Sequence, residues 1–580
     1  MGSQIITQRP PTKDPITSAL PGMNLLINPS GASLLVCLTL MGALALFNGK
    51  TGRKPKLAAA SWSGTVESRN ARKKAIQQLN EKRRNAVSFY INRPDIEELD
   101  EPIQLQGKPI ERFKITRDHA TLWLPDMQRG TAVIGAPGSG KTFSMIDPAL
   151  RSVIDQGVPL ALYDFKYPTQ SARLAGYARA NGYDVKIFAP GFPESEVCNL
   201  LEFMRDENDA EMARQIAQVL NKNFTQGDGK GGDQFFQMSG DQLITATLQL
   251  AKSTEFPDLL MCQKILALPD LVNRLKDDEL SQMNEWVRLS FDQLFSMAGS
   301  EKTISGVVST AMIMFSNFAS PSLIPCFTGK STIPLELTGK QLLIFGMDVD
   351  RREVIAPLLA TVIHMIMSKN LKPARKDPIV LSLDEFPTIK LPAIVRWLNE
   401  CREYGFCGVL GFQNFTQLEQ AYGKETSRAI LSGCNTKFIF NPGEQESAEY
   451  FSKYIGEEEI NYKSKSKSSG RGGGSTSVAD QDRTRKLFAP EQFLRLPAGT
   501  AVIINPAYAN KTEASIPFKR SIKVAKQDIE VMGRSGEVWD KVLAKLIKAN
   551  TKKAAEAEDL AARIKVMEAL FPGSQEEDEE

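Results

Sequence analysis

Histidine and closely paired cysteine are the features that this sequence has least of. Only two histidines, His119 and His364, occur in 580 residues, which leaves little material for a histidine-based metal centre or a catalytic triad. The seven cysteines, at positions 37, 198, 262, 326, 401, 407 and 434, include no C-x-x-C pair. This spacing argues against a zinc site and a disulfide framework, and it is typical of a reducing compartment.

The chain also lacks a strong overall charge. Its net charge is +3, which by itself predicts no class of partner. The distribution is uneven, because residues 50–90 carry eleven Lys or Arg against two Glu, and the last five residues are all acidic. With 42% hydrophobic and 24% charged residues, the composition is that of a globular protein, and the length predicts two or three domains.

Charged residues are absent between Asp14 and Lys50. The apolar part, residues 31–47, is 17 residues long, near the lower limit for a transmembrane helix. Basic residues follow immediately, so the positive-inside rule places the rest of the chain in the cytoplasm. We therefore predict a membrane anchor over residues 1–60. A second, weaker span over 15–28 stays open, and a signal peptide or a buried core helix are the alternatives.

Two further segments are basic. Within the juxtamembrane segment 61–115, residues 66–86 predict a basic surface helix that attracts anionic membrane lipids or, alternatively, nucleic acid. Residues 463–485 are rich in Ser, Gly, Lys and Arg, a composition that predicts a mobile loop. Such a loop is either simply solvated or touches nucleic acid through phosphate contacts.

The most specific motif is the octapeptide 135–142, which fits the phosphate-binding pattern G-x-x-x-x-G-K-[ST]. Its glycines let consecutive N–H groups face phosphate oxygens, and the following helix adds its positive N-terminus. Lys141 can reach the β- and γ-phosphates, and the Thr142 hydroxyl can ligate Mg²⁺. The sequence therefore predicts an ATP and Mg²⁺ site made of Gly135, Ala136, Pro137, Gly138, Ser139, Gly140, Lys141 and Thr142.

From residue 116 onward, short apolar runs alternate with helical stretches. Strands are predicted at 131–135, 159–164, 184–188, 342–347, 378–384, 408–413, 437–440 and 501–504. Runs this apolar are typical of parallel strands covered by helices. They predict an α/β fold with a RecA-like P-loop NTPase core over 116–190 and 338–530. Residues 191–337 show only helical periodicity and predict an inserted all-α domain, and residues 531–580 predict a tail with one helix over 537–570 and an acidic end.

Acidic and polar residues follow two of the predicted strands. Asp384 and Glu385 end an apolar strand in the Walker B pattern, which predicts that Asp384 supports Mg²⁺ and Glu385 polarises the attacking water. Gln413 ends the next strand and is predicted to sense the γ-phosphate. Between them lies Arg402, which either is a surface arginine or stabilises charge at the nucleotide of a neighbouring subunit. Arg396 is its nearest competitor.

Together these motifs resemble the TraG/TraD-type coupling proteins of conjugative type IV secretion systems. The matching pieces are GAPGSGKT, YDFK with Asp164 and Lys166, LDEFPTI, CREYG, and FQNFTQLEQAYG followed by LSGCNTKFIF. The resemblance implies a hexameric, ATP-driven pump in the bacterial inner membrane. Such a pump receives a relaxase-bound single DNA strand and passes it to the secretion channel. The resemblance also implies that 191–337 is the family's all-α domain and that Arg402 acts between subunits. The family has two membrane helices, whereas only one span is convincing here.

Three other functions compete with a conjugative DNA pump. A double-stranded DNA pump of the FtsK kind is disfavoured by the long helical insertion and by the lack of a winged-helix-like C-terminal domain. A receptor for protein effectors of a type IV secretion system is hardly distinguished by sequence. A pseudo-ATPase scaffold is disfavoured, because the catalytic lysine, threonine and two carboxylates are all present.

Overall fold

The computed structural model describes residues 60–104, 110–118, 120–224, 234–276, 283–297, 299–470, 473–553 and 556–572. They fall into two compact units, of which the smaller contributes residues 459–484 and the larger residues 60–458 together with the chain from 485 onward. The membrane spans predicted over 31–47 and 15–28 lie outside the described residues. Within the described ranges, every helix is too short or too polar to cross a bilayer.

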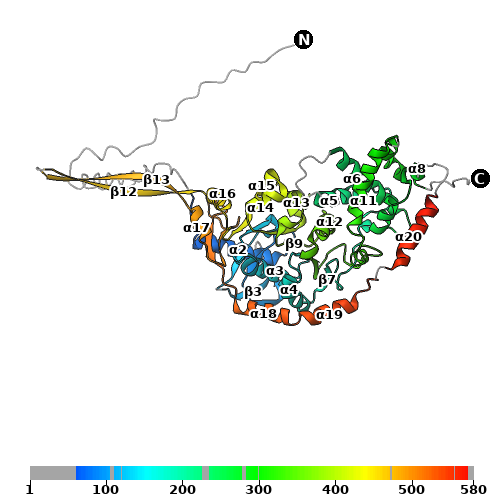
Figure 1. The fold of residues 1–580 in the computed structure, drawn as a ribbon. Helices are drawn as coiled ribbons and strands as arrows, with labels where there is room; N and C mark the ends of the chain where they lie inside the picture. The colour runs from blue at the N-terminus through cyan, green and yellow to red at the C-terminus, as the bar shows by residue number, and fades with distance from the viewer. Residues whose placement is uncertain are drawn as a thin grey trace, which may run out of the picture. The chain divides into compact units, whose positions relative to one another are not determined.

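A nine-stranded sheet forms the centre of the larger unit, in the order β15-β14-β11-β5-β10-β9-β6-β8-β7 (Figure 1). Its strands are β5 (Thr131–Ile134), β6 (Leu160–Asp164), β7 (Asp184–Phe188), β8 (Gln341–Gly346), β9 (Ile379–Leu383), β10 (Phe406–Phe412), β11 (Thr436–Ile439), β14 (Thr500–Ile504) and β15 (Phe518–Ser521). All eight predicted strands are present, which confirms the α/β class. β14 pairs antiparallel with both β11 and β15, so the sheet is mixed, although mostly parallel.

β15 was not predicted, because its sequence FKRS carries no apolar run. It is an edge strand with mostly exposed side chains, and strands of this kind need no buried face on either side. The central strands β5, β6, β9 and β10 are buried at every position. That double-sided burial explains why their sequences are continuously apolar.

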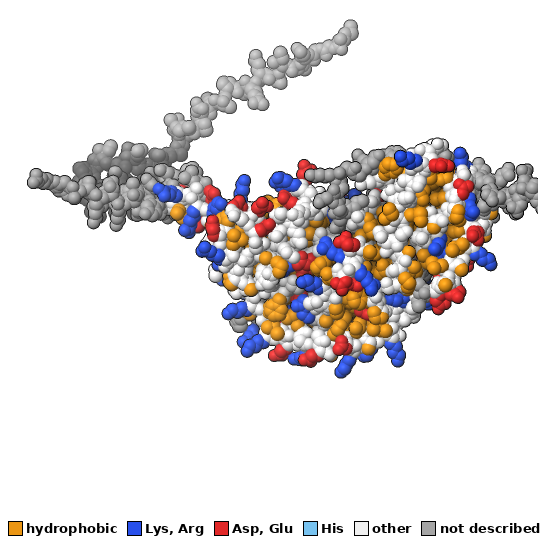
Figure 2. Space-filling model, in the orientation of Figure 1, with side chains coloured by type: hydrophobic (Ala, Val, Ile, Leu, Met, Phe, Trp, Pro, Cys, Tyr) orange, Lys and Arg blue, Asp and Glu red, His pale blue; other side chains and the backbone are white. Residues whose placement is uncertain are grey.

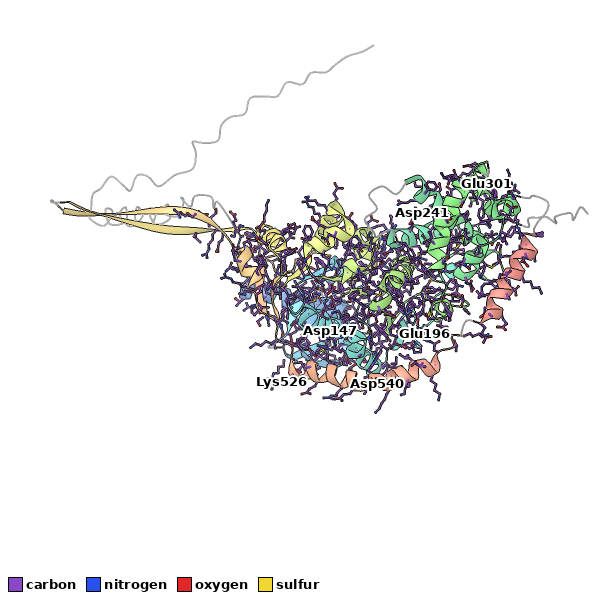
Figure 3. The ribbon with its side chains drawn as sticks, viewed as in Figure 1. Asp147, Glu196, Asp241, Glu301, Lys526 and Asp540 are labelled. Atoms are coloured by element: carbon purple, nitrogen blue, oxygen red, sulfur yellow. The ribbon has the colours of Figure 1, made fainter. Side chains whose placement is uncertain are left out.

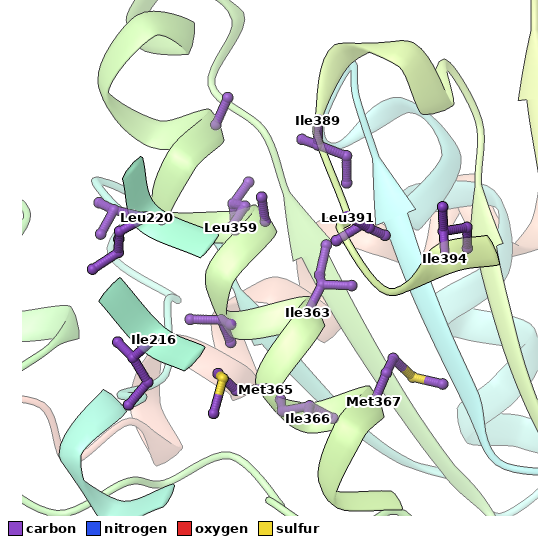
Figure 4. Packing of buried hydrophobic residues seen from close by; sticks show 14 of the residues in the cluster. Ile216, Leu220, Leu359, Ile363, Met365, Ile366, Met367, Ile389, Leu391 and Ile394 are labelled. Atoms are coloured by element: carbon purple, nitrogen blue, oxygen red, sulfur yellow. The ribbon is translucent and has the colours of Figure 1, made fainter. Parts of the chain in front are cut away.

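One face of the sheet is covered by α12 (Arg352–Asn370), whose side chains are buried almost all round from Ile355 to Met367. α12 lies between the sheet and α5 (Ala210–Phe224), and both contribute to one hydrophobic core. Figure 4 shows the meeting of the three parts, with Ile216 and Leu220 from α5, Leu359 and Ile363 from α12, and Ile389 and Leu391 from the segment after β9. The helices between β7 and β8 are thereby joined to the sheet through a shared core.

The described residues between β7 and β8 form helices and loops only. The α-helices are α5, α6 (Gln234–Lys252), α7 (Leu259–Leu266), α8 (Leu271–Lys276), α9 (Glu285–Leu289), α10 (Asp292–Ser296) and α11 (Glu301–Ser316). α7 ends at Leu266, and Asp270, with a left-handed backbone (φ 54°), precedes α8. On the face shown in Figure 2, basic and acidic side chains are interspersed, in keeping with the small net charge.

The basic segment before the sheet forms α2 (Thr65–Glu81), close to the helix predicted over 66–86. Its buried side comprises Ala71, Ala75 and Leu79, and its charged side faces outward. Two antiparallel pairs that were not predicted follow, β1 (Phe89–Ile91) with β4 (Leu122–Leu124) and β2 (Asp95–Ile103) with β3 (Glu111–Arg117). The β2 residues DIEELDEPI are mainly exposed and charged, so they lack the apolar pattern of a core strand.

The prediction that residues 463–485 form a loop is wrong for the described residues, while their mobility stays a prediction. Residues 463–470 and 473–485 belong to β12 (Glu457–Gly470) and β13 (Gly473–Lys486), which pair into a two-stranded ribbon. Each strand supplies the backbone hydrogen-bond partners of the other, so no hydrophobic core is needed to satisfy the peptide groups. A Ser/Gly/Lys composition excludes a core, but it does not exclude such a ribbon.

The single helix predicted over 537–570 is two helices in the structure, and a third helix precedes them. In chain order the three are α18 (Lys526–Glu537), α19 (Trp539–Ala549) and α20 (Ala557–Leu570). The Ser535 hydroxyl of α18 donates to Ala172 O of α4 (Thr169–Ala180) at 2.9 Å, and α19 also packs on α4. α20 packs instead on α7. Figure 1 shows the three helices running from the sheet to the helical region, and Figure 3 labels Lys526, the first residue of α18, and Asp540, the second residue of α19.

A buried ion pair fixes α20. The Arg563 guanidinium donates to both carboxylate oxygens of Asp258, at 3.3 Å and 2.5 Å, and lies 4.7 Å from the Phe256 ring centroid. Both side chains are almost completely buried. Asp258 also caps α7 by accepting from the Met261 amide at 2.9 Å.

We expect Arg563→Ala to cost about 3–5 kcal/mol of folding free energy locally, because it leaves the Asp258 carboxylate buried without its counter-ion. The measurement is hydrogen exchange of α20 amides, which should accelerate strongly. The control is Arg534→Ala, whose partner Glu530 is exposed and whose loss should cost less than about 1 kcal/mol. Equal exchange in both variants would show that the buried pair does not hold α20.

Candidate nucleotide-binding site

The loop between β5 and the following helix has the conformation that a phosphate-binding loop requires. Gly138 and Gly140 have φ of 77° and 91°, in the left-handed region that other residues rarely adopt. The helix begins with a π turn over Thr142–Ile146 and continues as α3 (Asp147–Asp155). The Ser139 hydroxyl is buried and makes no hydrogen bond to another described group. The loop therefore leads directly into a helix N-terminus, a position that suits an anion.

Two distant segments hold this loop in place. The Gly499 amide donates to Ser139 O, and the Ala136 amide donates to Asn441 O, both at 2.8 Å. A Cβ on Gly140 would lie 2.8 Å from the Gly499 nitrogen, so a larger residue there would push the two backbones apart. Sequence reasoning missed Gly499 and Asn441, because neither stands in a motif.

The end of β9 brings two carboxylates to the loop. The Lys141 Nζ lies 2.7 Å from Glu385 Oε1 and 3.8 Å from Asp384 Oδ1, and the Thr142 hydroxyl donates to Asp384 Oδ2. Glu385 has a left-handed backbone with φ of 60°. This turn directs successive side chains toward the same site, whereas in an extended strand they would alternate between faces. The four predicted residues Lys141, Thr142, Asp384 and Glu385 are thus together.

Gln413 joins them from the neighbouring strand. β10 pairs in parallel with β9, Leu410 lying opposite Leu383, so the two carboxyl ends meet at one edge of the sheet. The Gln413 Nε2 donates to Glu385 Oε2 at 3.2 Å. The close approach of β10 to Asp384 depends on Gly411, because a Cβ at that position would lie 2.6 Å from Asp384 Oδ1 and 3.3 Å from Asp384 Cα.

Arg402 is not at this edge in its own chain. It lies in the 3-10 helix Cys401–Tyr404, immediately before β10, and its Nε donates to Asn399 O at 3.1 Å. β10 runs from Phe406 to Phe412, and six residue steps of a strand measure about 20 Å. The Arg402 guanidinium therefore lies near the opposite edge of the sheet from Gln413.

The YDFK residues end β6, the strand next to β9, where Tyr163 lies opposite Leu383, so Asp164 is at the same carboxyl edge of the sheet as Asp384. The Asp164 Oδ2 accepts from the amides of Gln170 and Ser171, at 3.0 Å and 2.8 Å, and from the Ser171 hydroxyl at 2.7 Å. Burial raises the pKa of Asp164, and these hydrogen bonds oppose the rise. Asp164 thus anchors the start of α4, and Lys166 is exposed.

A buried charge cluster underlies the loop. Asp147, labelled in Figure 3, is fully buried one turn beyond Thr142, and burial raises its pKa to about 6, opposed by Arg173 and Gln170. Its Oδ1 accepts from Gln170 Nε2 at 2.8 Å, and Arg173 Nη1 lies 3.3 Å from Oδ2. Because Asp147 is on α3 and its partners are on α4, the cluster fixes the helix that carries the loop against its neighbour.

These side chains fit a nucleoside triphosphate with a divalent cation. The Thr142 hydroxyl and the Asp384 carboxylate are oxygen ligands of the kind that Mg²⁺ prefers. Lys141, only 7% exposed, supplies a positive charge where phosphates would lie beside the loop. Glu385 is a carboxylate held between Lys141 and Gln413, within reach of a water at the same edge.

Comparison with known proteins identifies a matching family and a similar curated protein. The family model described as "Type IV secretion-system coupling protein DNA-binding domain" matches residues 119–517. Coupling protein TraD of Escherichia coli (strain K12) is 29% identical over 150 residues, which cover 25% of this chain and 21% of TraD.

Two solved structures share the fold. The structure of plasmid coupling protein TrwB in complex with ADP and Mg²⁺ has a TM-score of 0.55 at 15% identity, covering 82% of this chain and 96% of that chain. An unbound form of the bacterial conjugative coupling protein TrwB has a TM-score of 0.52 at 15% identity, with 69% and 86% covered.

Proposed function

The chain belongs to the type IV secretion-system coupling proteins, and from this premise we propose that it hydrolyses ATP to drive DNA into a secretion channel. The observation that carries the proposal is the cluster of Lys141, Thr142, Asp384, Glu385 and Gln413 at one edge of the sheet. A coupling protein that only bound its cargo would not need a carboxylate such as Glu385, able to accept a proton from water, beside Lys141 of the phosphate-binding loop. The TrwB structure with ADP and Mg²⁺ supports the choice of nucleotide and metal.

Each residue has a distinct task in this mechanism. Gly138 and Gly140 shape the loop so that its amides face the phosphates, and Lys141 binds the β- and γ-phosphate oxygens. Thr142 and Asp384 are the groups that would hold Mg²⁺, which supplies charge neutralisation between the phosphates when bound. Glu385 orients a water and accepts its proton, and Gln413 fixes the Glu385 carboxylate in place.

The remaining parts of the proposal concern assembly. The chain is proposed to form a ring, hexameric as in the family it resembles, in which Arg402 of one copy reaches the nucleotide of the next. Its N-terminal 60 residues anchor it in the bacterial inner membrane, with the bulk of the chain in the cytoplasm. The helices over 191–337 face the cargo, a single DNA strand bound to a relaxase and its partners, and the ring delivers that strand to the channel.

DNA-stimulated ATP hydrolysis by the full chain, purified in detergent, tests the proposal. We expect single-stranded DNA to raise the turnover rate, and the stimulation to fall steeply with added salt, because phosphate contacts release counter-ions. Stimulation by duplex DNA alone would favour an FtsK-like pump. ATP hydrolysis that no DNA affects would favour delivery of protein effectors, and no hydrolysis would contradict the motor.

A further inference from the structure

The first described residues of the chain present an exposed amphipathic surface, which we call the N-terminal face. It comprises the exposed residues Val66, Arg69 and Lys73 of α2, and Trp62 just before α2, which lies beside Lys486 and Lys519 from two other segments. Trp62 is 38% exposed and Val66 56% exposed. Val66, Arg69 and Lys73 follow each other at helical spacing on α2, on the side opposite the buried alanines.

A cavity of about 720 Å³ opens beside Trp62. Its walls include Trp62, Phe488, Lys486 and Lys519. The Trp62 and Phe488 rings meet edge to face with centroids 5.8 Å apart, and Lys519 Nζ lies 5.6 Å from the Phe488 centroid. The cavity thus has an aromatic wall and ammonium groups at its rim, a combination that accepts an anionic group attached to an apolar body.

Most acidic groups near the face are engaged elsewhere. Glu458 lies 2.6 Å from Arg485, and Glu67 accepts from the Gly64 amide at 2.9 Å. Glu491, which also lines the cavity, is exposed. Glu458 and Arg485 both line the cavity and offset each other, and Arg69, Lys73, Lys486 and Lys519 outnumber Glu67 and Glu491, so the face is net positive.

Backbone hydrogen bonds tie the start of the N-terminal face to the body of the protein. The Ala60 amide donates to Glu457 O at 3.0 Å, and the Ser63 amide donates to Pro517 O at 2.9 Å. The predicted span ends at Phe47, thirteen residues before Ala60, and thirteen residues reach at most about 45 Å when fully extended. If residues 31–47 span a bilayer, Ala60 therefore lies within about 45 Å of the membrane surface.

From these observations we infer that the N-terminal face rests on the bilayer and that the cavity beside Trp62 takes the phosphate of an anionic phospholipid. The inference rests on the proposed membrane anchor. Tryptophan and aliphatic side chains beside lysine and arginine are the pattern of a membrane interface, where the ring enters the headgroup layer and the cations meet lipid phosphates. A DNA-binding surface would gain little from an exposed valine on the same helix face as its cations.

Full-length protein in bilayer discs tests this inference. Discs of phosphatidylcholine, alone or mixed with phosphatidylglycerol, carry brominated chains that quench tryptophan fluorescence at the interface. The difference between wild type and Trp62→Phe isolates the signal of Trp62. We expect Trp62 to be quenched in the mixed discs and much less in the neutral ones. Lys486→Gln with Lys519→Gln should lower the local binding constant about 30-fold, since each lysine near an anionic surface contributes about fivefold.

The matched control is Lys424→Gln with Lys545→Gln, two exposed lysines away from the face, which should leave quenching unchanged. Equal quenching in both kinds of disc, or no effect of the first double variant, overturns the inference. The inference is also overturned if a single-stranded oligonucleotide, and not lipid, changes the fluorescence of Trp62. Failure of the chain to enter either kind of disc would contradict the proposed membrane anchor, but not the lipid binding of the face. The same full-length chain mixed with anionic vesicles would then test the face by the same Trp62 signal. DNA-stimulated ATP hydrolysis is read separately in every arm.

Discussion

Glu385→Gln is expected to reduce ATP turnover by about 10²–10⁴-fold while leaving nucleotide binding nearly intact. Glutamine keeps the shape of the side chain and can still contact Gln413 and Lys141, which flank it at 3.2 Å and 2.7 Å. It cannot accept a proton from water at neutral pH, so only the chemical step is lost. Turnover is measured by phosphate release, and binding by titration with a fluorescent ATP analogue.

Two further variants make this result specific. Lys141→Ala should weaken nucleotide binding as well as turnover, because Lys141 contacts the phosphates in the ground state. Glu425→Gln, at an exposed position on α15 (Lys424–Gly433), should change neither quantity. If Glu385→Gln hydrolyses ATP at the wild-type rate, Glu385 is not the proton acceptor and the proposed mechanism is wrong. If it loses nucleotide binding instead, its role is to position Lys141.

The sequence predicted the centre of the site because local patterns specify it. Glycines at fixed positions, a lysine and a threonine form a motif whose geometry is set within eight residues. The carboxylates Asp384 and Glu385 and the amide Gln413 stand at the ends of apolar strands, and parallel strands end at a common edge. In the structure these side chains lie in contact with one another.

Other features depend on contacts between distant segments, which leave no local signal. Gly499 supports the loop through one backbone hydrogen bond to Ser139, and glycine is frequent in loops whatever those loops contact. The β12–β13 ribbon forms from residues whose composition predicts disorder, because cross-strand pairing replaces a core. The docking of α20 depends on the ion pair between Arg563 and Asp258, 305 residues apart in the sequence. Hydrophobic periodicity does not predict a contact of this kind.

Arg402→Ala is expected to reduce ATP turnover by about 10³-fold in the assembled protein, with nucleotide affinity retained. The structure puts Arg402 about 20 Å along β10 from Gln413, beyond the reach of an arginine side chain within one chain. If Arg402 acts at all on a nucleotide, it therefore acts on that of a neighbouring copy. Arg396→Ala is the control, since Arg396 is exposed on α13 (Ile394–Glu400), five residues before Cys401.

Mixing two inactive variants separates this role from a merely structural one. A subunit carrying Glu385→Gln still offers Arg402, and a subunit carrying Arg402→Ala still offers Glu385. In a ring with head-to-tail contacts, about a quarter of the interfaces in an equal random mixture would then join one intact Arg402 to one intact Glu385. We expect ATP turnover to reappear on mixing, toward that fraction of the wild-type rate, although each variant alone is inactive. No recovery in rings shown to contain both variants would mean that Arg402 serves its own subunit or only its fold. A folding role would also appear as a lowered melting temperature of Arg402→Ala, which the shared-site mechanism does not predict.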